Sequence, residues 1–142
     1  MNRTLPPLLI ALTLMTACGA NAAGVTIDDA WIPEAPPGSG VMAGYLTLRN
    51  ATGKPLRCDA VSGADFGAAE IHRSVIDNGQ SRMLRDQVID LAPGTQAVLE
   101  RGGLHLMLFR PQRALRAGDQ TELQIRCGEV TVTASFRIDR RP

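Results

Sequence analysis

The segment 102–109 carries a histidine and a methionine that a β-strand would place side by side. It reads Gly-Gly-Leu-His-Leu-Met-Leu-Phe, so a single residue separates His105 from Met107. Residues two apart on a strand point to the same face of the sheet. With the three leucines on the core face, His105 and Met107 are predicted to project together from the opposite face.

The second histidine of the chain, His72, lies near Met83 across a predicted turn, an Asp-Asn-Gly sequence at 77–79. If Asp-Asn forms a two-residue turn, His72 pairs directly with Met83. If Asn-Gly forms it, which is the stronger type I′ signal, Met83 pairs with Ser74 and lies diagonal to His72. Both registers place His72 and Met83 on one face, within reach of each other, whereas a three-residue loop would put them on opposite faces.

Two imidazoles and two thioethers form a ligand set that favours Cu(I). Thioether sulfur is soft and neutral, and it suits Cu(I) far better than Zn(II), Mg(II) or Ca(II). Zinc would need thiolates or carboxylates beside histidine. Four neutral ligands leave the positive charge of the ion uncompensated, which limits the affinity, as a site that gives its metal away requires. Taken singly, a methionine is usually core filler, so the prediction depends on the joint spacing.

Period-two alternation dominates the rest of the chain, and no segment has the pattern of an amphipathic helix. The clearest run is 130–138, where Val, Val, Ala, Phe and Ile occupy one face. Turn signals rich in Gly, Pro and Asn separate the runs. The expected strands are 25–32, 41–49, 56–61, 69–76, 81–89, 96–100, 104–109, 122–127 and 130–138. Many short strands without helices predict an all-β antiparallel sandwich or barrel, one domain over 23–142.

Residues 1–22 have the features of a secretory signal peptide. They contain one positive residue, Arg3, then a short apolar stretch, and the Ala-Asn-Ala sequence ending at Ala22 fits the usual cleavage pattern. A Leu-Met-Thr-Ala-Cys sequence ending at Cys18 loosely resembles a lipoprotein cleavage site, which would make Cys18 a lipid anchor. We therefore expect an exported, periplasmic protein with two possible processing routes. No further apolar run approaches membrane-spanning length.

Charge and cysteine content narrow the classes of partner and compartment. Arg3 is the only charged residue of the signal segment, which leaves 14 basic residues against 14 acidic ones. This balance gives no reason to expect nucleic acid or an anionic membrane surface as a partner. Cys58 and Cys127 are the cysteines after the signal segment, and alternation turns both toward the core. We expect a disulfide between them, with two separate buried thiols as the alternative.

The intervals between the four candidate ligands resemble a known signature. Ten residues separate His72 from Met83, twenty-one separate Met83 from His105, and one separates His105 from Met107. This spacing is similar to the H(M)-x10-M-x21-H-x-M pattern of the periplasmic copper chaperones called the PCu(A)C family. All four positions and both long intervals match.

The resemblance extends to the segments 43–50, 102–108 and 115–119, and it implies a fold and a role. The fold is a cupredoxin-like Greek-key β-sandwich or barrel. The role is that of a monomeric, non-enzymatic carrier of Cu(I), which it delivers to the CuA site of cytochrome c oxidase or to another copper chaperone. Two features depart from the family. Arg73 stands where many members have a second methionine, which places a cation beside the site, and the Met- and His-rich tail of some members is absent.

Three other classes of protein compete with this interpretation. A blue-copper electron carrier needs a cysteine thiolate with two histidines, and neither Cys58 nor Cys127 belongs to such a cluster. Zinc hydrolases and Ser-His-Asp enzymes would group more histidines or carboxylates than this chain does. A metal-free exported interaction domain is the remaining alternative, and it predicts that replacing His105 and Met107 has no functional effect.

Overall fold

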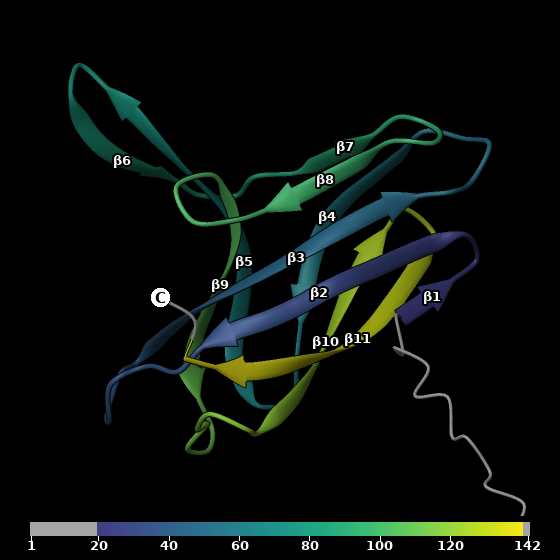
Figure 1. Cartoon of the computed structure of the whole chain (residues 1–142). Helices are drawn as coiled ribbons and strands as arrows, with labels where there is room; N and C mark the ends of the chain where they lie inside the picture. Colours follow the sequence, from purple (N-terminus) through teal and green to yellow (C-terminus); the bar gives the residue numbers. More distant parts are fainter. Residues whose placement is uncertain (1–19, 141–142) are drawn as a thin grey trace, which may run out of the picture.

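The computed structural model of the protein describes residues 20–140. Within them the chain forms eleven strands and no helix (Figure 1), which confirms the all-β prediction. The strands are β1 (Ala20–Ala22), β2 (Val25–Pro33), β3 (Val41–Asn50), β4 (Leu56–Ser62), β5 (Phe66–Asp77), β6 (Gln80–Leu84), β7 (Ile89–Leu91), β8 (Gln96–Leu99), β9 (Leu104–Pro111), β10 (Gln120–Cys127) and β11 (Val130–Asp139).

The strands form one curved sheet in the order β6-β5-β9-β3-β2-β11-β10-β4-β7, with β1 beside β2 and β8 beside β3. Several spatial neighbours, such as β5 and β9 or β4 and β10, are distant in sequence, as Greek-key connections require. Along one edge β3 pairs first with β9, over 41–44, and then with β8, over 46–49. The sheet therefore divides at β3 and curves round on itself (Figure 1). The buried side chains form one core, as expected for a sandwich or barrel.

The core follows the alternation seen in the sequence. Every second residue of β10 is buried, and β11 shows the same alternation along most of its length. Ile125 and Phe136 are among the largest fully buried side chains, as are Leu106 and Leu108 on β9. Burial of such a side chain contributes about 1.5–3 kcal/mol to folding. The same alternation turns the intervening residues of β9 away from the core, toward the candidate site.

A disulfide joins Cys58 on β4 to Cys127 on β10, and both residues are fully buried. The bridge predicted from their alternation is confirmed. It connects positions 69 residues apart in sequence. A cross-link closing a loop of that length stabilises the fold by about 4 kcal/mol in the chain-entropy model.

The prediction of one strand over 81–89 is wrong. The chain leaves β6 after Leu84, turns, and begins β7 at Ile89. Asp86 lies in this turn with a positive φ of 52°, a conformation that Asp tolerates better than most residues. The backbone N–H of Gln87 donates to the carbonyl of Ile71, which folds the segment back over β5. Consequently β6 pairs with β5, whereas β7 pairs with β4.

The predicted signal segment falls largely outside the described residues, and so does Cys18. Its last three residues form β1, which pairs with β2 through a tight turn at Ala23 and Gly24. Both turn residues have positive φ, 47° and 82°, as a type I′ turn requires. The cleavage expected after Ala22 would therefore remove a paired strand. No helix in the described part of the chain has the length and apolar character needed to span a bilayer.

Asn50, the last residue of β3, is completely buried. Its amide nitrogen donates to the carbonyls of Lys54, Leu91 and Ala92, and its oxygen accepts from the backbone N–H and the hydroxyl of Thr52. Buried polar groups need such partners. Asn50 thereby fastens the end of β3 to the segment after β7.

Candidate metal centre

The pairing of β5 with β9 brings the two histidines together. His72 lies directly opposite His105, and their ring centroids are 6.0 Å apart. Two residues along, Glu70 lies opposite Met107. Directly opposite residues of an antiparallel pair share a face, so His72, His105 and Met107 all project from the face opposite to Leu106. Segments 33 residues apart in the sequence thus supply one site.

The β5–β6 hairpin adds Met83 to the same face. Its two-residue turn consists of Asn78 and Gly79, both with positive φ (50° and 77°), and Met83 pairs with Ser74. The Asn-Gly register is therefore the one adopted, and Met83 lies diagonal to His72. The hairpin projects from the body of the sheet (Figure 1), and Met83 remains 48% exposed. The structure thus sets all four predicted residues on one face, with Met83 at its solvent edge.

Within residues 20–140, each imidazole has one ring nitrogen engaged and one without a hydrogen bond. Nε2 of His72 lies 2.6 Å from a carboxylate oxygen of Glu70, while its Nδ1 is buried and has no hydrogen-bond partner. In His105 the arrangement is reversed, because Nδ1 lies 3.1 Å from the carbonyl of Gly103. A neutral imidazole has one donor and one acceptor nitrogen. Since both partners can only accept, Nδ1 of His72 and Nε2 of His105 keep free lone pairs.

Glu70 connects the site to a cation. Arg85 donates from one guanidinium nitrogen to both carboxylate oxygens, at 3.0 and 3.1 Å. The hydrogen bond from His72 has the largest effect in lowering the pKa of Glu70 below its usual value, and the hydrogen bonds from Arg85 lower that pKa further. This carboxyl is therefore ionised at neutral pH. Glu70 was not among the predicted site residues. The sequence does contain a signal for Glu70, because it lies two residues before His72 on the same predicted strand and therefore shares its face.

The cation beside the site is not the one expected. Arg73 pairs with Leu84 on one side and Leu104 on the other. Its side chain therefore leaves β5 from the face opposite to His72, because neighbouring residues of a strand alternate between faces. The positive charge near the site comes from Arg85 instead, which the turn after β6 carries over β5.

The donor set fits a soft metal ion. A buried imidazole nitrogen without a partner normally costs free energy, and a bound ion would satisfy it. Within residues 20–140 no group of three or more His, Cys, Asp and Glu residues could hold a metal. Met83 and Met107 lie on the same face as the two histidines, and thioether sulfur favours Cu(I) over zinc or calcium.

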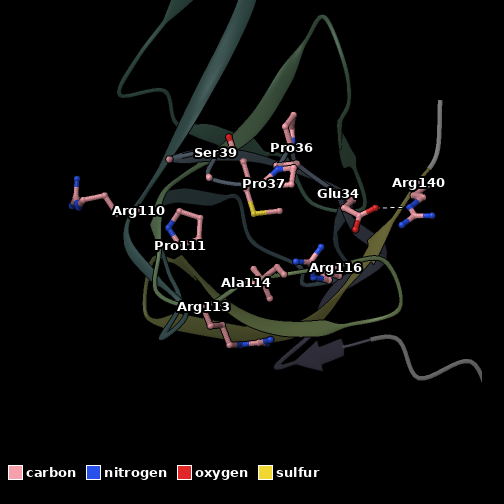
Figure 2. A pocket seen from close by; sticks show the side chains of 15 residues that line it. Glu34, Pro36, Pro37, Ser39, Arg110, Pro111, Arg113, Ala114, Arg116 and Arg140 are labelled. Atoms are coloured by element: carbon pink, nitrogen blue, oxygen red, sulfur yellow. Dashed lines mark hydrogen bonds and ion pairs between the residues drawn. The ribbon is translucent and has the colours of Figure 1, made fainter.

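A groove of about 790 Å³ lies away from this face, at the other end of β9. Figure 2 shows Pro36, Pro37 and Pro111 around it, with an ion pair between Glu34 and Arg140 at its border. The hydrogen bond from Arg140 lowers the pKa of Glu34. None of the four predicted ligands lines this groove. The candidate metal centre is therefore identified by the arrangement of its ligands and not by a groove.

A model of the family described as "Putative lipoprotein LpqE-like" matches residues 25–136. This chain belongs to the LpqE-like family. Among individual relatives, protein RP573 of Rickettsia prowazekii is 32% identical over 80 residues, which are 56% of this chain and 44% of that protein. The protein named as the putative lipoprotein Lxx21020 of Leifsonia xyli subsp. xyli is 29% identical over 110 residues, 76% of this chain and 64% of its own length. This LpqE-like protein thus spans less than two thirds of either relative.

Solved structures show where this LpqE-like fold has been seen before. The apo PCuAC domain from PmoF1 matches with a TM-score of 0.75 at 19% identity, covering 87% of this chain and all of that domain. The copper-bound PCuAC domain from PmoF2 matches with a TM-score of 0.73, also at 19% identity, over 87% of this chain and 99% of its own. Cu(I)-loaded DR1885 from Deinococcus radiodurans matches at 0.60 and 21% identity, over 81% of this chain and 77% of that one. The predicted resemblance to the PCu(A)C fold is confirmed.

Proposed function

We propose that this LpqE-like protein binds one Cu(I) ion through His72, Met83, His105 and Met107 and transfers it to another protein. The observation that carries the proposal is the cross-strand pair of histidines, 6.0 Å apart between ring centroids. Each has one ring nitrogen that makes no hydrogen bond in the part of the chain that the structure describes. The registers that put Met83 and Met107 on the same face support their inclusion as the third and fourth ligands.

The ligand types account for both selectivity and release. Two thioethers favour Cu(I) over harder ions. All four ligands are neutral, and Arg85 balances the charge of nearby Glu70, so no net negative charge near the site opposes release of the ion. Met83 is the ligand at the solvent edge. A thiolate or thioether of the acceptor would displace Met83 first and the more buried ligands afterwards, without free copper appearing.

The fold neighbours support copper as the cargo. The PmoF2 domain is titled copper-bound and the DR1885 structure is titled as the Cu(I) form. By the same resemblance, the acceptor is the CuA centre of cytochrome c oxidase or another copper chaperone, and the protein works as a monomeric carrier without enzymatic activity. The two cysteines after the signal segment are joined in a disulfide, so neither offers the thiolate of a blue-copper site.

We further propose that the protein is exported and anchored through a lipid on Cys18. The family and one relative are described as lipoproteins. Cleavage before Cys18 keeps β1 paired with β2, whereas cleavage after Ala22 removes it. Mass spectrometry of the protein from its native host decides between the routes. A diacylated N-terminal cysteine is expected, and an unmodified chain beginning at Ala23 would contradict it.

Anaerobic titration against a chromogenic Cu(I) chelator, combined with X-ray absorption, tests the proposed site. We expect one ion per chain with sulfur and nitrogen neighbours, and a marked loss of affinity in Met83→Ala and Met107→Ala. Met42→Leu is the matched control, because Met42 is buried in the core and lies outside the site. Unchanged affinity in the Met83/Met107 double variant would dispose of the proposal and favour a metal-free interaction domain.

A further inference from the structure

The buried hydrogen bond between His72 and Glu70 selects which atom of His72 can bind a ligand. The side chain of His72 is 3% exposed, and Nε2 lies 2.6 Å from a carboxylate oxygen that is also bound by Arg85. An ionised carboxylate can only accept a hydrogen bond. The proton of the neutral imidazole must therefore lie on Nε2, which leaves Nδ1 as the nitrogen with a lone pair.

The other ring nitrogen of His72, Nδ1, is a buried atom whose hydrogen-bonding capacity is unsatisfied. Among the described residues, Nδ1 of His72 is the one buried side-chain nitrogen or oxygen atom without a hydrogen-bond partner. The ring of His105 lies across from it and that of Phe109 lies 6.1 Å away between centroids. Water has little access to this atom, and an ion bound beside the two histidines would satisfy it.

We infer that Glu70, held by Arg85, is a positioning residue that fixes the tautomer of His72, so that the ion is bound by Nδ1 of His72 and Nε2 of His105. This inference rests on the proposed function. Histidines that bind metals commonly donate their other ring N–H to a carboxylate or a carbonyl, which fixes the ring and raises its basicity. Here Glu70 has that role for His72 and the carbonyl of Gly103 has it for His105.

Arg85 explains why Glu70 supports the site without becoming a ligand. Its guanidinium donates hydrogen bonds to both carboxylate oxygens of Glu70, and one of these oxygens also accepts a hydrogen bond from His72. The charge of Glu70 is balanced by Arg85, and fewer of its oxygen lone pairs remain to bind a metal ion. Arg85 reaches this place because the chain turns after β6 instead of continuing as a strand, and its carbonyl in turn accepts from the Gln87 side chain.

Long-range ¹H–¹⁵N NMR of the imidazoles tests the inference on the full folded chain, first without copper. We expect His72 to show a protonated Nε2 and an imine-like Nδ1, and His105 the opposite tautomer. On adding Cu(I), which is diamagnetic, the resonances of Nδ1 of His72 and Nε2 of His105 should shift most. A protonated Nδ1 in apo His72, or coordination of His72 through Nε2, would overturn the inference.

Variants of Glu70 give a second readout. Glu70→Leu removes the acceptor, so His72 should lose its single tautomer and Cu(I) affinity should fall about 10- to 100-fold. Glu70→Gln keeps a carbonyl acceptor and should restore both properties to within a few-fold, which also covers the case in which the leucine variant does not fold. Arg85→Ala should lower the affinity more than Arg82→Ala, the matched control that pairs with Asp77 on the same hairpin.

The outcomes distinguish failure of Cu(I) binding from failure of the role assigned to Glu70. If the wild-type protein binds no Cu(I), the proposed function fails and the ligand assignment fails with it, although the apo tautomers can still be measured. If the wild type binds Cu(I) and Glu70→Leu changes neither the tautomer nor the affinity, only the role of Glu70 is wrong.

Discussion

The hairpins β10–β11 and β5–β6 are built alike but contact different surroundings. Each has a two-residue turn and antiparallel pairing. In β10–β11 the inward side chains are buried, whereas all five residues of β6 are exposed and β6 lies at the edge of the sheet. The first hairpin stabilises the core. The second adds little burial, which leaves its Met83 available to a metal or a partner.

The largest expected effect belongs to the buried hairpin. Phe136→Ala should lower the free energy of unfolding by about 4 kcal/mol, because it removes a fully buried ring and leaves a cavity. Urea denaturation measures the change. Thr133→Ala on the exposed side of the same strand is the control, and an equal loss in both variants would mean that β11 does not face the core as described.

The disulfide should have the next largest effect. Replacing both Cys58 and Cys127 by alanine removes the cross-link between β4 and β10. The protein should lose about 3 kcal/mol of stability, less than the chain-entropy value, because measured losses commonly fall below that model. The Cu(I) affinity should stay within a few-fold of wild type, because none of the four candidate ligands lies on β4 or β10. Two reactive thiols per chain in the unfolded, unreduced wild type would show that the bridge does not form.

A smaller, pH-dependent effect is expected at Asp65, next to the start of β10. Hydrogen bonds from Arg113 and then Thr121 lower the pKa of Asp65 below its usual value. Its contribution to stability is therefore present above the pKa of the unfolded chain and disappears as the pH falls through the lower folded value. Asp65→Asn should cost about 1–2 kcal/mol at pH 7 and converge with wild type in acid. Stability curves that stay parallel down to pH 2 would contradict this.

The smallest effect is expected at the tip of the projecting hairpin. Ile76 is 74% exposed, and Ile76→Ser should change the free energy of unfolding by less than about 0.5 kcal/mol. Thermal unfolding measures it against Phe136→Ala. A loss comparable to that of the core variant would remove the distinction between the two hairpins.

Alternation along the chain determined much of this protein. It predicted the all-β fold, the inward cysteines that form the disulfide, and the common face of His105 and Met107, because side-chain direction on a strand has a period of two whatever the strand pairs with. The Asn-Gly turn likewise favoured the register that relates Met83 to His72. These are local properties, so they are readable without a structure.

Only the tertiary structure decided which strands lie beside one another. The pairing that sets His72 across from His105, the turn that ends β6 and brings Arg85 to Glu70, and the buried bonds of Asn50 all join segments that are not continuous in sequence. A pattern of period two specifies the face of each side chain but not its neighbour on the next strand. Packing between separate segments therefore decides which ligands face each other and brings Arg85 to Glu70.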